Sequence, residues 1–402
     1  MRVAIAHDWL TGMRGGEKVL EVLCEAFPGS EIFTLLHVPG SVSATIEKHR
    51  IHTSFIQNIP WSKKLYRACL PLFPLAVERL RPGGFDLVLS TSHCVAKGVI
   101  APPGVPHISY IHTPMRYVWD RFDDYFDSSR TSRIRRSCAA LAARRLRAWD
   151  SSTAARVDRF VANSRNVASK VRRFYGREAD VICPPVDCSR FSMDRRGPGD
   201  YYLVVSALVP YKRVDLAVEA MGRLGRRLVV IGSGPEERRL KRLAPPSVEF
   251  LGWRSPEEIA GYYSRCRALV FPGEEDFGIV PLEAMASGRP VVAFGRGGAL
   301  ETVVPINAPS APPGPPGPRA VPGAPTGVFF HDRTPESLAA AVDLLEREMG
   351  RFDPPSIRAR ALEFDRPLFK KRISDYILSA YDELTGGRGE GGKEMRLART
   401  PF

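Results

Sequence analysis

Residues 273–294 read GEEDFGIVPLEAMASGRPVVAF, a stretch in which a loop, a short helix and a strand follow one another. Pro281 suits the first turn of a helix and Gly288 suits the position just past its end, so the segment LEAMAS is predicted to be helical. The strand-like RPVVAF follows at once. This order is one step of a parallel α/β sheet, in which ligands bind at the loops after the strands.

The same alternation of apolar strands and amphipathic helices runs through most of the chain. Near the N-terminus, RVAIAH is followed by a helix that places Val19, Leu20, Leu23 and Phe27 on one face. A second series of strands begins with YYLVVSALV, and 402 residues are too many for one ordinary core. The fold class is therefore predicted to be α/β, with two Rossmann-like, doubly wound parallel sheets that face each other across a cleft.

Proline-rich segments mark the expected boundaries. RRGPGD at 195–200 is the connector, and a stretch with nine prolines at 305–325 can join neither helix nor sheet. The predicted organisation is an N-terminal Rossmann-like domain over 1–194 and a C-terminal Rossmann-like domain over 195–365 that carries this insert. A helix over 366–385 is expected to return to the N-terminal domain, and 386–402 is expected to be a disordered tail.

Composition narrows the class of protein. The chain is 44% hydrophobic and 25% charged, as in soluble globular proteins, and lacks the ~18 consecutive apolar residues of a membrane span. Its first residues are already strand-like, so no signal peptide is expected. Seven scattered cysteines without a C-x-x-C pair favour reduced thiols in the cytoplasm. A net charge of +14 favours anionic partners, whether phosphorylated substrates, a membrane surface or nucleic acid.

The opening stretch places Glu275 and Glu283 on either side of the loop FGIV (277–280). Taken alone, Glu275 is a solvated turn acid, and Glu283 is a first-turn acid that favours the helix dipole. However, free N–H groups at a helix start form an anion site, and the two carboxylates could accept hydrogen bonds from hydroxyl groups. A nucleotide sugar combines a diphosphate with such hydroxyls.

A diphosphate also needs fixed positive charge and close backbone approach. Lys212 and Arg213 follow a predicted strand of the second domain, and they could equally be an ordinary basic first turn. Gly15 and Gly16, between the first strand and the first helix, would let backbone approach a phosphate or a sugar. They do not form the dinucleotide fingerprint G-x-G-x-x-G, and the G-x-G of IGSGPEE (231–237) is as easily a tight turn.

His112 ends a predicted strand in YIHTPMRYVWD and would point into the cleft. A lone histidine in that place is more often structural, but its polar and aromatic neighbours could line a sugar site. Histidine spacing gives no metal site, and G-x-S-x-G is absent. The sequence thus predicts no metal and no cofactor beyond a nucleotide-sugar co-substrate.

The opening stretch resembles the E-x7-E signature of the retaining glycosyltransferase family 4, which has the GT-B fold. The longer blocks look most like bacterial mannosyltransferases that build O-antigen, capsule and exopolysaccharide. The blocks that carry the resemblance are HDWLTGMRGGEKVLE, TSHCVAKGVI, HTPMRYVWD, VANSRNVASKV, PPVD, YKRVDLAVEA, VIGSGPE and FGRGGALETV.

The resemblance implies a role for each candidate residue. Glu275 and His112 would meet the transferred sugar, Lys212 the diphosphate and Glu283 the ribose. Many family members have an arginine several residues before the lysine, where this chain has Ser206, and Arg213 is a candidate for that second charge. The backbone that would hold phosphate and sugar belongs to Gly15, Gly16, Phe277, Gly278, Ile279 and Val280.

The resemblance further implies front-face transfer of mannose from GDP-mannose to a lipid-linked oligosaccharide at the cytoplasmic side of the membrane. The basic segment 61–81, with Trp61, Leu70, Leu72 and Phe73 expected to be exposed, would form a peripheral surface for an anionic membrane. A UDP-sugar transferase and a sugar epimerase of the same fold are alternatives. Nucleic acid is not expected as a partner, because the seven arginines of 130–147 accompany no recognisable nucleic-acid module.

Overall fold

The computed structural model describes the chain except for residues 121, 123–132, 195–196, 307–323 and 387–402. Most of the predicted proline-rich insert and the predicted tail therefore lie outside the described residues. The chain divides into two compact units, residues 1–184 with 369–402 and residues 185–368. The division places 185–194 in the second unit, whereas the sequence prediction gave them to the first domain.

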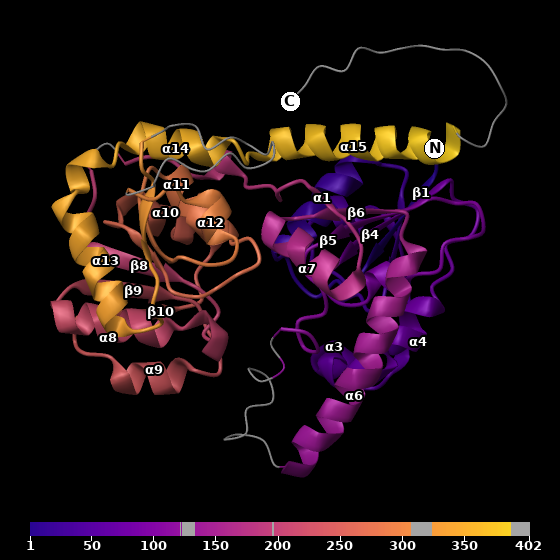
Figure 1. The fold of residues 1–402 in the computed structure, drawn as a ribbon, viewed down its shortest axis with the longest axis horizontal. Helices are drawn as coiled ribbons and strands as arrows, with labels where there is room; N and C mark the ends of the chain where they lie inside the picture. Colours follow the sequence, from indigo (N-terminus) through magenta and orange to yellow (C-terminus); the bar gives the residue numbers. More distant parts are fainter. Residues whose placement is uncertain (121, 123–132, 195–196, 307–323, 387–402) are drawn as a thin grey trace. The chain divides into compact units, whose positions relative to one another are not determined.

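The first unit is built on seven parallel strands in the order β3-β2-β1-β4-β5-β6-β7 (Figure 1). The strand order reverses direction between β1 and β4, which pair from Val3 with Leu87 to His7 with Thr91. In open parallel sheets, ligands bind outside the carboxyl ends of the strands at such a reversal. The strands are β1 Val3–His7, β2 Glu31–Thr34, β3 Arg50–Thr53, β4 Leu87–Ser92, β5 His107–Ile111, β6 Arg159–Ala162 and β7 Asp180–Val181.

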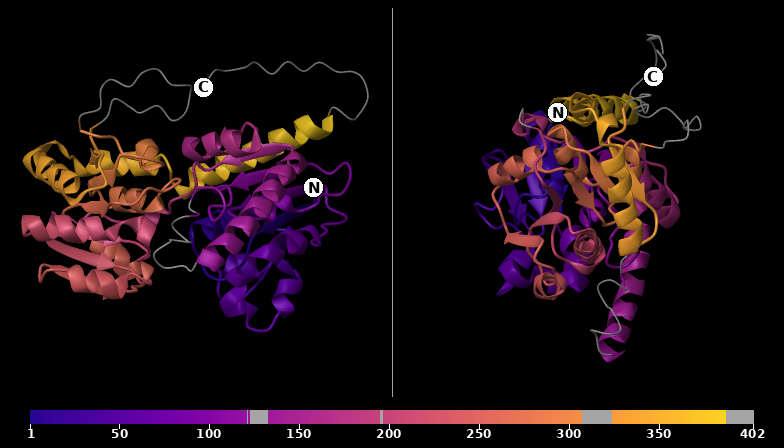
Figure 2. Two further views of the ribbon diagram at one scale, coloured as in Figure 1. Left: turned by 60° about the horizontal axis from the view of Figure 1, so that its bottom comes forward. Right: turned by 90° about the vertical axis from the view of Figure 1, so that its left-hand side faces the viewer.

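Helices cover both faces of this sheet. The helix α15 enters the core on one face through Phe369, Ile373 and Ile377, beside Leu20 and Leu23 of α1. Figures 1 and 2 show that the first part of α6 extends beyond the rest of the unit. The helices are α1 Gly15–Ala26, α2 Ala44–Glu47, α3 Ser62–Leu65, α4 Phe73–Glu78, α6 Arg133–Ser152, α7 Arg165–Tyr175 and α15 Arg366–Gly386, with 3-10 turns η1 Phe55–Asn58, η2 Tyr66–Leu72, η3 Ala96–Gly98 and η4 Thr153–Arg156.

The second unit has six parallel strands in the order β10-β9-β8-β11-β12-β13, with the reversal between β8 and β11. The prediction of two parallel-sheet α/β domains is therefore confirmed. The strands are β8 Tyr201–Val205, β9 Arg227–Ile231, β10 Val248–Gly252, β11 Leu269–Phe271, β12 Val291–Phe294 and β13 Gly327–Phe330. The helices are α8 Val214–Leu224, α9 Glu237–Leu243, α10 Pro256–Arg265, α11 Ile279–Ala286, α12 Ala299–Thr302, α13 Pro335–Arg347 and α14 Pro354–Leu362, with 3-10 turns η5 Cys188–Arg190, η6 Pro210–Lys212 and η7 Met349–Arg351.

The segment 61–81 of the first unit is only partly the exposed surface that the sequence predicts. Trp61 and Leu72 are exposed, at 76% and 43%. Phe73 is wrongly predicted to be exposed, because it is buried against the ring of Trp9, and Leu70 packs partly against the same core. None of the helices in the described part of the chain is both long and apolar enough to cross a membrane.

Candidate functional site

Gly15 and Gly16 open α1 directly beyond the carboxyl end of β1, as the sequence predicts. The amide of Arg14 donates to the Glu17 carboxylate at 3.0 Å and so anchors the start of the helix. A Cβ atom added at Gly16 would lie 3.6 Å from Nε2 of His112 and 3.6 Å from Cε1 of His7. The start of α1 is therefore flanked by two imidazole rings.

His112 follows β5, and its main chain is fixed on both sides. Its amide donates to the Ser92 carbonyl at 2.8 Å, and its carbonyl accepts from the Asn163 amide side chain at 3.0 Å. The imidazole is 9% exposed, and its Nε2 has no hydrogen-bond partner among the residues that the structure describes. Burial, followed by the charges of His93, His7 and Arg116, holds the pKa of His112 well below its ordinary value. The ring is therefore neutral at pH 7.

Sequence reasoning missed four polar residues in the surroundings of this ring. His7 and His93 act on the pKa of His112, and Glu17 and Asp8 lie next to those two histidines. The buried Asp8 carboxylate accepts the amides of His93, Cys94, Val95 and Ala96 at 2.6 to 2.9 Å. It also lies 3.0 Å from Nδ1 of His93, whose pKa burial nonetheless lowers. The dipeptide His7-Asp8 at the end of the first strand was the available signal, because polar side chains there face the ligand edge of the sheet.

In the second unit, the structure brings Lys212 and Glu275 together in an ion pair. Lys212 lies in η6 after β8, and Glu275 lies in the loop after β11. A Cβ atom at Gly273 would lie 3.1 Å from the Lys212 backbone, so the two loops pack closely. Both side chains stay partly accessible, at 16% and 20%. The pair therefore lies at the carboxyl edge of the sheet on either side of its reversal point.

Arg213 does not join this pair. It has a left-handed backbone, with φ of +50°, and caps the start of α8. Its guanidinium donates to the Asp215 carboxylate at 3.1 to 3.3 Å. Ser206, which stands where many family members have an arginine, follows β8, and its amide donates to the Ile231 carbonyl at 3.0 Å. The structure thus pairs one of the two predicted cations with Glu275 and directs the other to Asp215.

The loop FGIV places Gly278 at the N-cap of α11, with φ of +85°. The Phe277 ring is buried and lies 5.9 Å from the ring of Phe364, so this residue presents only its backbone. A Cβ atom at Gly298 would come within 2.3 Å of the Phe277 Cα atom, and the Gly298 amide donates to the Glu275 carbonyl at 2.9 Å. The loop after β12 therefore supports the loop that carries Glu275.

Because α11 begins at Ile279 and includes Val280, it starts earlier than the predicted LEAMAS helix. Glu283 therefore lies beyond the first turn, and the expectation that it favours the helix dipole there is wrong. Its carboxylate instead accepts a hydrogen bond from the Tyr263 hydroxyl at 3.0 Å. Tyr263 is fully buried in α10, and burial together with Glu283 raises its pKa well above the ordinary value. A buried hydroxyl thus fixes the Glu283 side chain, a contact that the sequence did not reveal.

The glycines of IGSGPEE have a structural explanation. A Cβ atom at Gly232 or Gly234 would collide with the carbonyls of Ser206 or Leu208, at 1.9 and 2.3 Å. They allow the loop after β9 to pack against the loop after β8, which gives both glycines a packing role. Across the described residues, no cluster of three or more His, Cys, Asp or Glu side chains could hold a metal ion.

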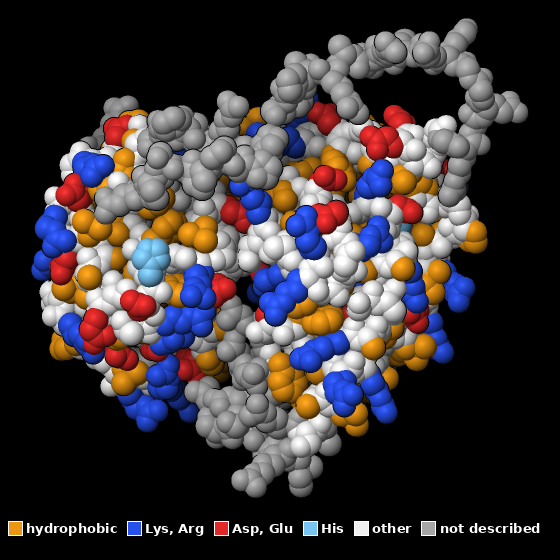
Figure 3. Space-filling view, viewed as in Figure 1, with side chains coloured by type: hydrophobic (Ala, Val, Ile, Leu, Met, Phe, Trp, Pro, Cys, Tyr) orange, Lys and Arg blue, Asp and Glu red, His pale blue; other side chains and the backbone are white. Residues whose placement is uncertain are grey.

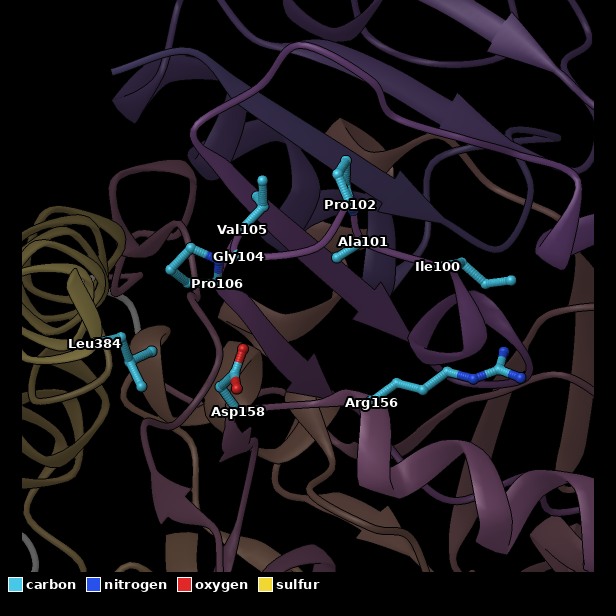
Figure 4. A pocket seen from close by; sticks show the side chains of 9 residues that line it. All are labelled: Ile100, Ala101, Pro102, Gly104, Val105, Pro106, Arg156, Asp158 and Leu384. Carbon is cyan, nitrogen blue, oxygen red and sulfur yellow. The ribbon is translucent and has the colours of Figure 1, made fainter. Parts of the chain in front are cut away.

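A hollow of about 340 Å³ lies elsewhere in the first unit (Figure 4). Its lining includes Pro106, which precedes β5, Asp158, which precedes β6, and Leu384 of α15. His112 and Gly16 lie at the carboxyl ends of β5 and β1, so the hollow is at the opposite edge of the sheet. It includes none of the predicted site residues.

Comparison with known proteins gives two family matches. Residues 13–190 match the profile described as "Glycosyltransferase Family 4", and residues 189–353 match "Glycosyl transferases group 1". The two matches together span all strands from β2 to β13 and every predicted site residue.

Solved structures share the fold over nearly the whole chain. A sucrose-phosphate synthase from Thermosynechococcus elongatus superposes with a TM-score of 0.68 at 18% identity, covering 95% of this chain and all of its own. The Anabaena protein HepE in complex with UDP superposes with a TM-score of 0.64 at 15% identity, covering 94% of this chain and all of its own. At these identities the likeness concerns the fold, which is that of two-domain glycosyltransferases.

A curated relative is closer in sequence over a shorter stretch. The GDP-mannose-dependent alpha-(1-6)-phosphatidylinositol monomannoside mannosyltransferase of Mycolicibacterium smegmatis is 34% identical over 149 residues, which are 32% of this chain and 39% of the relative. Matches to curated relatives of this kind span only 30 to 40% of the relatives' own lengths.

Proposed function

Because the chain belongs to glycosyltransferase family 4 and is a glycosyltransferase, we propose that it transfers mannose from GDP-mannose to a lipid-linked oligosaccharide during synthesis of a cell-surface polysaccharide. The observation that carries the proposal is the pairing of Lys212 with Glu275 at the reversal point of the second sheet. The name of the Mycolicibacterium relative supports mannose and a guanine nucleotide as the donor.

The pair of Lys212 and Glu275 suggests how the second unit receives the donor. A diphosphate would attract the Lys212 ammonium away from Glu275, and the freed carboxylate would accept hydrogen bonds from the hydroxyls of the sugar. Lys212 would then stabilise the negative charge that develops on the leaving diphosphate. Glu283, held by the Tyr263 hydroxyl, would accept hydrogen bonds from the ribose hydroxyls. Because Arg213 is bonded to Asp215, we assign the charge stabilisation to Lys212.

The reaction is proposed to retain the configuration of the sugar. The acceptor hydroxyl would attack the face from which the diphosphate departs, and a phosphate oxygen of the leaving group would take its proton. In this route the protein positions the substrates and stabilises the developing charge, and no protein nucleophile is required. The proposal requires no metal ion and no cofactor beyond the nucleotide sugar.

We place the acceptor at the inner face of the cell membrane, to which the protein would attach peripherally. Exposed apolar side chains gather between residues 61 and 75, where Trp61, Leu65, Leu72 and Leu75 are 43 to 76% exposed. The exposed Lys63 and Arg67 lie among them. Figure 3 shows lysine and arginine side chains beside hydrophobic ones over α4 and α6 of the same unit. Such a mixture favours an anionic lipid surface.

The proposal is tested by incubating the protein with GDP-mannose, UDP-glucose or UDP-galactose, with and without a lipid-linked oligosaccharide, and detecting products by mass spectrometry. A mannosylated lipid is the expected product. If product forms with a UDP-sugar and not with GDP-mannose, the proposed donor is refuted. If the sugar nucleotide is converted to another one without any acceptor, the protein is an epimerase. Glu275→Ala should abolish transfer. Glu274→Ala is the matched control, because Glu274 lies on the same loop as Glu275 but pairs with Arg333.

A further inference from the structure

His7 has no role in the function proposed above, although it faces the same glycine as His112. The ring is 1% exposed, and its Nε2 has no hydrogen-bond partner among the described residues. A buried polar nitrogen in this state has lost its hydrogen bond to water and gained none in return, so native proteins keep few of them. Two such nitrogens, one on each of the rings of His7 and His112 that flank Gly16, indicate that a ligand supplies the missing partner.

The surroundings of His7 define which nitrogen faces the ligand. Its Nδ1 is hydrogen-bonded to the Thr91 hydroxyl across the pairing of β1 with β4. When that hydroxyl donates to Nδ1, the ring proton lies on Nε2, which becomes a donor. The Glu17 carboxylate lies 3.8 Å from Nε2, too far for a hydrogen bond but close enough to attract its proton. Although burial acts to raise it, the pKa of Glu17 lies below its ordinary value, so this carboxylate is charged at neutral pH.

The start of α1 determines the chemistry of the ligand. This helix is twelve residues long, and its first turn is made by Gly15 and Gly16, so backbone amides and the positive end of the helix dipole are accessible there. Phosphoryl oxygens fit amides and imidazole donors together. We infer that His7, positioned by Thr91 and Glu17, donates from Nε2 to a phosphoryl group bound at the start of α1, beside Nε2 of His112.

The inference rests on the proposed function, in which phosphate enters from either of two sources. One is the diphosphate of the nucleotide sugar, and the other is the phosphate that links the acceptor oligosaccharide to its lipid. Both present the same oxygens to Gly16 and His7. The inference adds a residue to the phosphate site and leaves the identity of the transferred sugar open.

The experiment uses the full-length protein and two variants of His7 that separate the ring nitrogens. His7→Asn retains a partner for Thr91 near Nδ1 but removes Nε2, whereas His7→Gln places an amide nitrogen near the position of Nε2. His107→Asn is the matched control, because this buried histidine of β5 has both nitrogens bonded, to Ser90 and to the Arg156 carbonyl, at the opposite edge. Titration calorimetry gives Kd for GDP, GMP, UDP and UMP, and steady-state assays give KM for acceptors with and without the phosphate.

We expect His7→Asn to weaken the binding of the nucleoside diphosphate about tenfold, which equals about 1.4 kcal/mol, while the monophosphate changes less than twofold. His7→Gln should recover most of that loss, and His107→Asn should change none of these constants. A tenfold rise in KM for the phosphorylated acceptor, with unchanged GDP affinity, would support the inference with the acceptor as the source.

Two results would overturn the inference. In one, His7→Asn leaves the diphosphate affinity and the acceptor KM unchanged. In the other, it weakens GDP and GMP equally and His107→Asn does the same, which is the signature of a general loss of structure. Binding is measured without turnover, so a protein that transfers no sugar but still binds diphosphate through His7 would refute the proposed function and not this site.

Discussion

The hydrogen bond between Tyr263 and Glu283 makes a quantitative prediction about nucleotide binding. Tyr263→Phe removes one oxygen from a fully buried side chain and leaves the ring in place beside Phe191. The lost bond is 3.0 Å long and ends on a carboxylate, and bonds to charged groups contribute about 1.5–3 kcal/mol. Because Glu283 is half-buried and water can replace part of the loss, we take the lower value, about tenfold in affinity.

The assay compares GDP with 2′-deoxy-GDP by titration calorimetry. If Tyr263 orients Glu283 toward the ribose, the wild type should prefer GDP, and Tyr263→Phe should lose most of that preference. Tyr202→Phe is the control, because Tyr202 is equally buried and its hydroxyl donates to Glu346 at 2.8 Å. It should lower stability without changing the preference. If Tyr263→Phe keeps the wild-type ratio of the affinities for GDP and 2′-deoxy-GDP, the reasoning is refuted.

Three further predictions concern stability and the donor loop. Lys97→Met should lower the free energy of unfolding in urea by about 3–5 kcal/mol, because it leaves the buried Asp150 carboxylate without the ammonium 3.0 Å away; a loss below about 1 kcal/mol would contradict this. Burial lowers the pKa of His107 from 6.5 to about 4, so the unfolded chain binds a proton that the folded chain does not. Protonation of His107 in the unfolded chain therefore leaves the free energy of unfolding unchanged above pH 6.5 and lowers it by roughly 3 kcal/mol as the pH falls to 4. His107→Gln should show a shallower decline in unfolding free energy over that window. Gly298→Ala should weaken nucleotide binding at least tenfold, about 1.4 kcal/mol, because the new methyl group collides with the Phe277 backbone; unchanged binding by calorimetry would show that the loop adapts.

Much of the fold could be predicted because strand and helix patterns are local. The apolar runs near residues 3–7 and 201–205 become β1 and β8, and both sheets are parallel. Helix starts were harder, because Gly278 adopts a backbone conformation that begins α11 before Pro281. Phe73 looked exposed beside cations, but only the three-dimensional path of the chain brings Trp9 next to it.

The candidate site was predictable where one loop carries the chemistry and unpredictable where distant segments meet. Glu275 and Lys212 were singled out from their own loops, and the structure adds that they pair. Tyr263, in contrast, is an ordinary helical tyrosine until α10 brings its hydroxyl to Glu283. His7 likewise gains its significance from Gly16 and Thr91, which lie on other elements.

The placement of α15 has a consequence for how the chain is made. The core of the first unit includes Phe369, Ile373 and Ile377, which are translated after the whole second unit. At about 5–20 residues per second, the ribosome needs roughly ten to forty seconds to reach them after it has made residue 184. During that time the apolar face that α15 will cover is open on a nascent chain. The N-terminal half is thus finished last, and a protein truncated before residue 369 should aggregate rather than retain a working first unit.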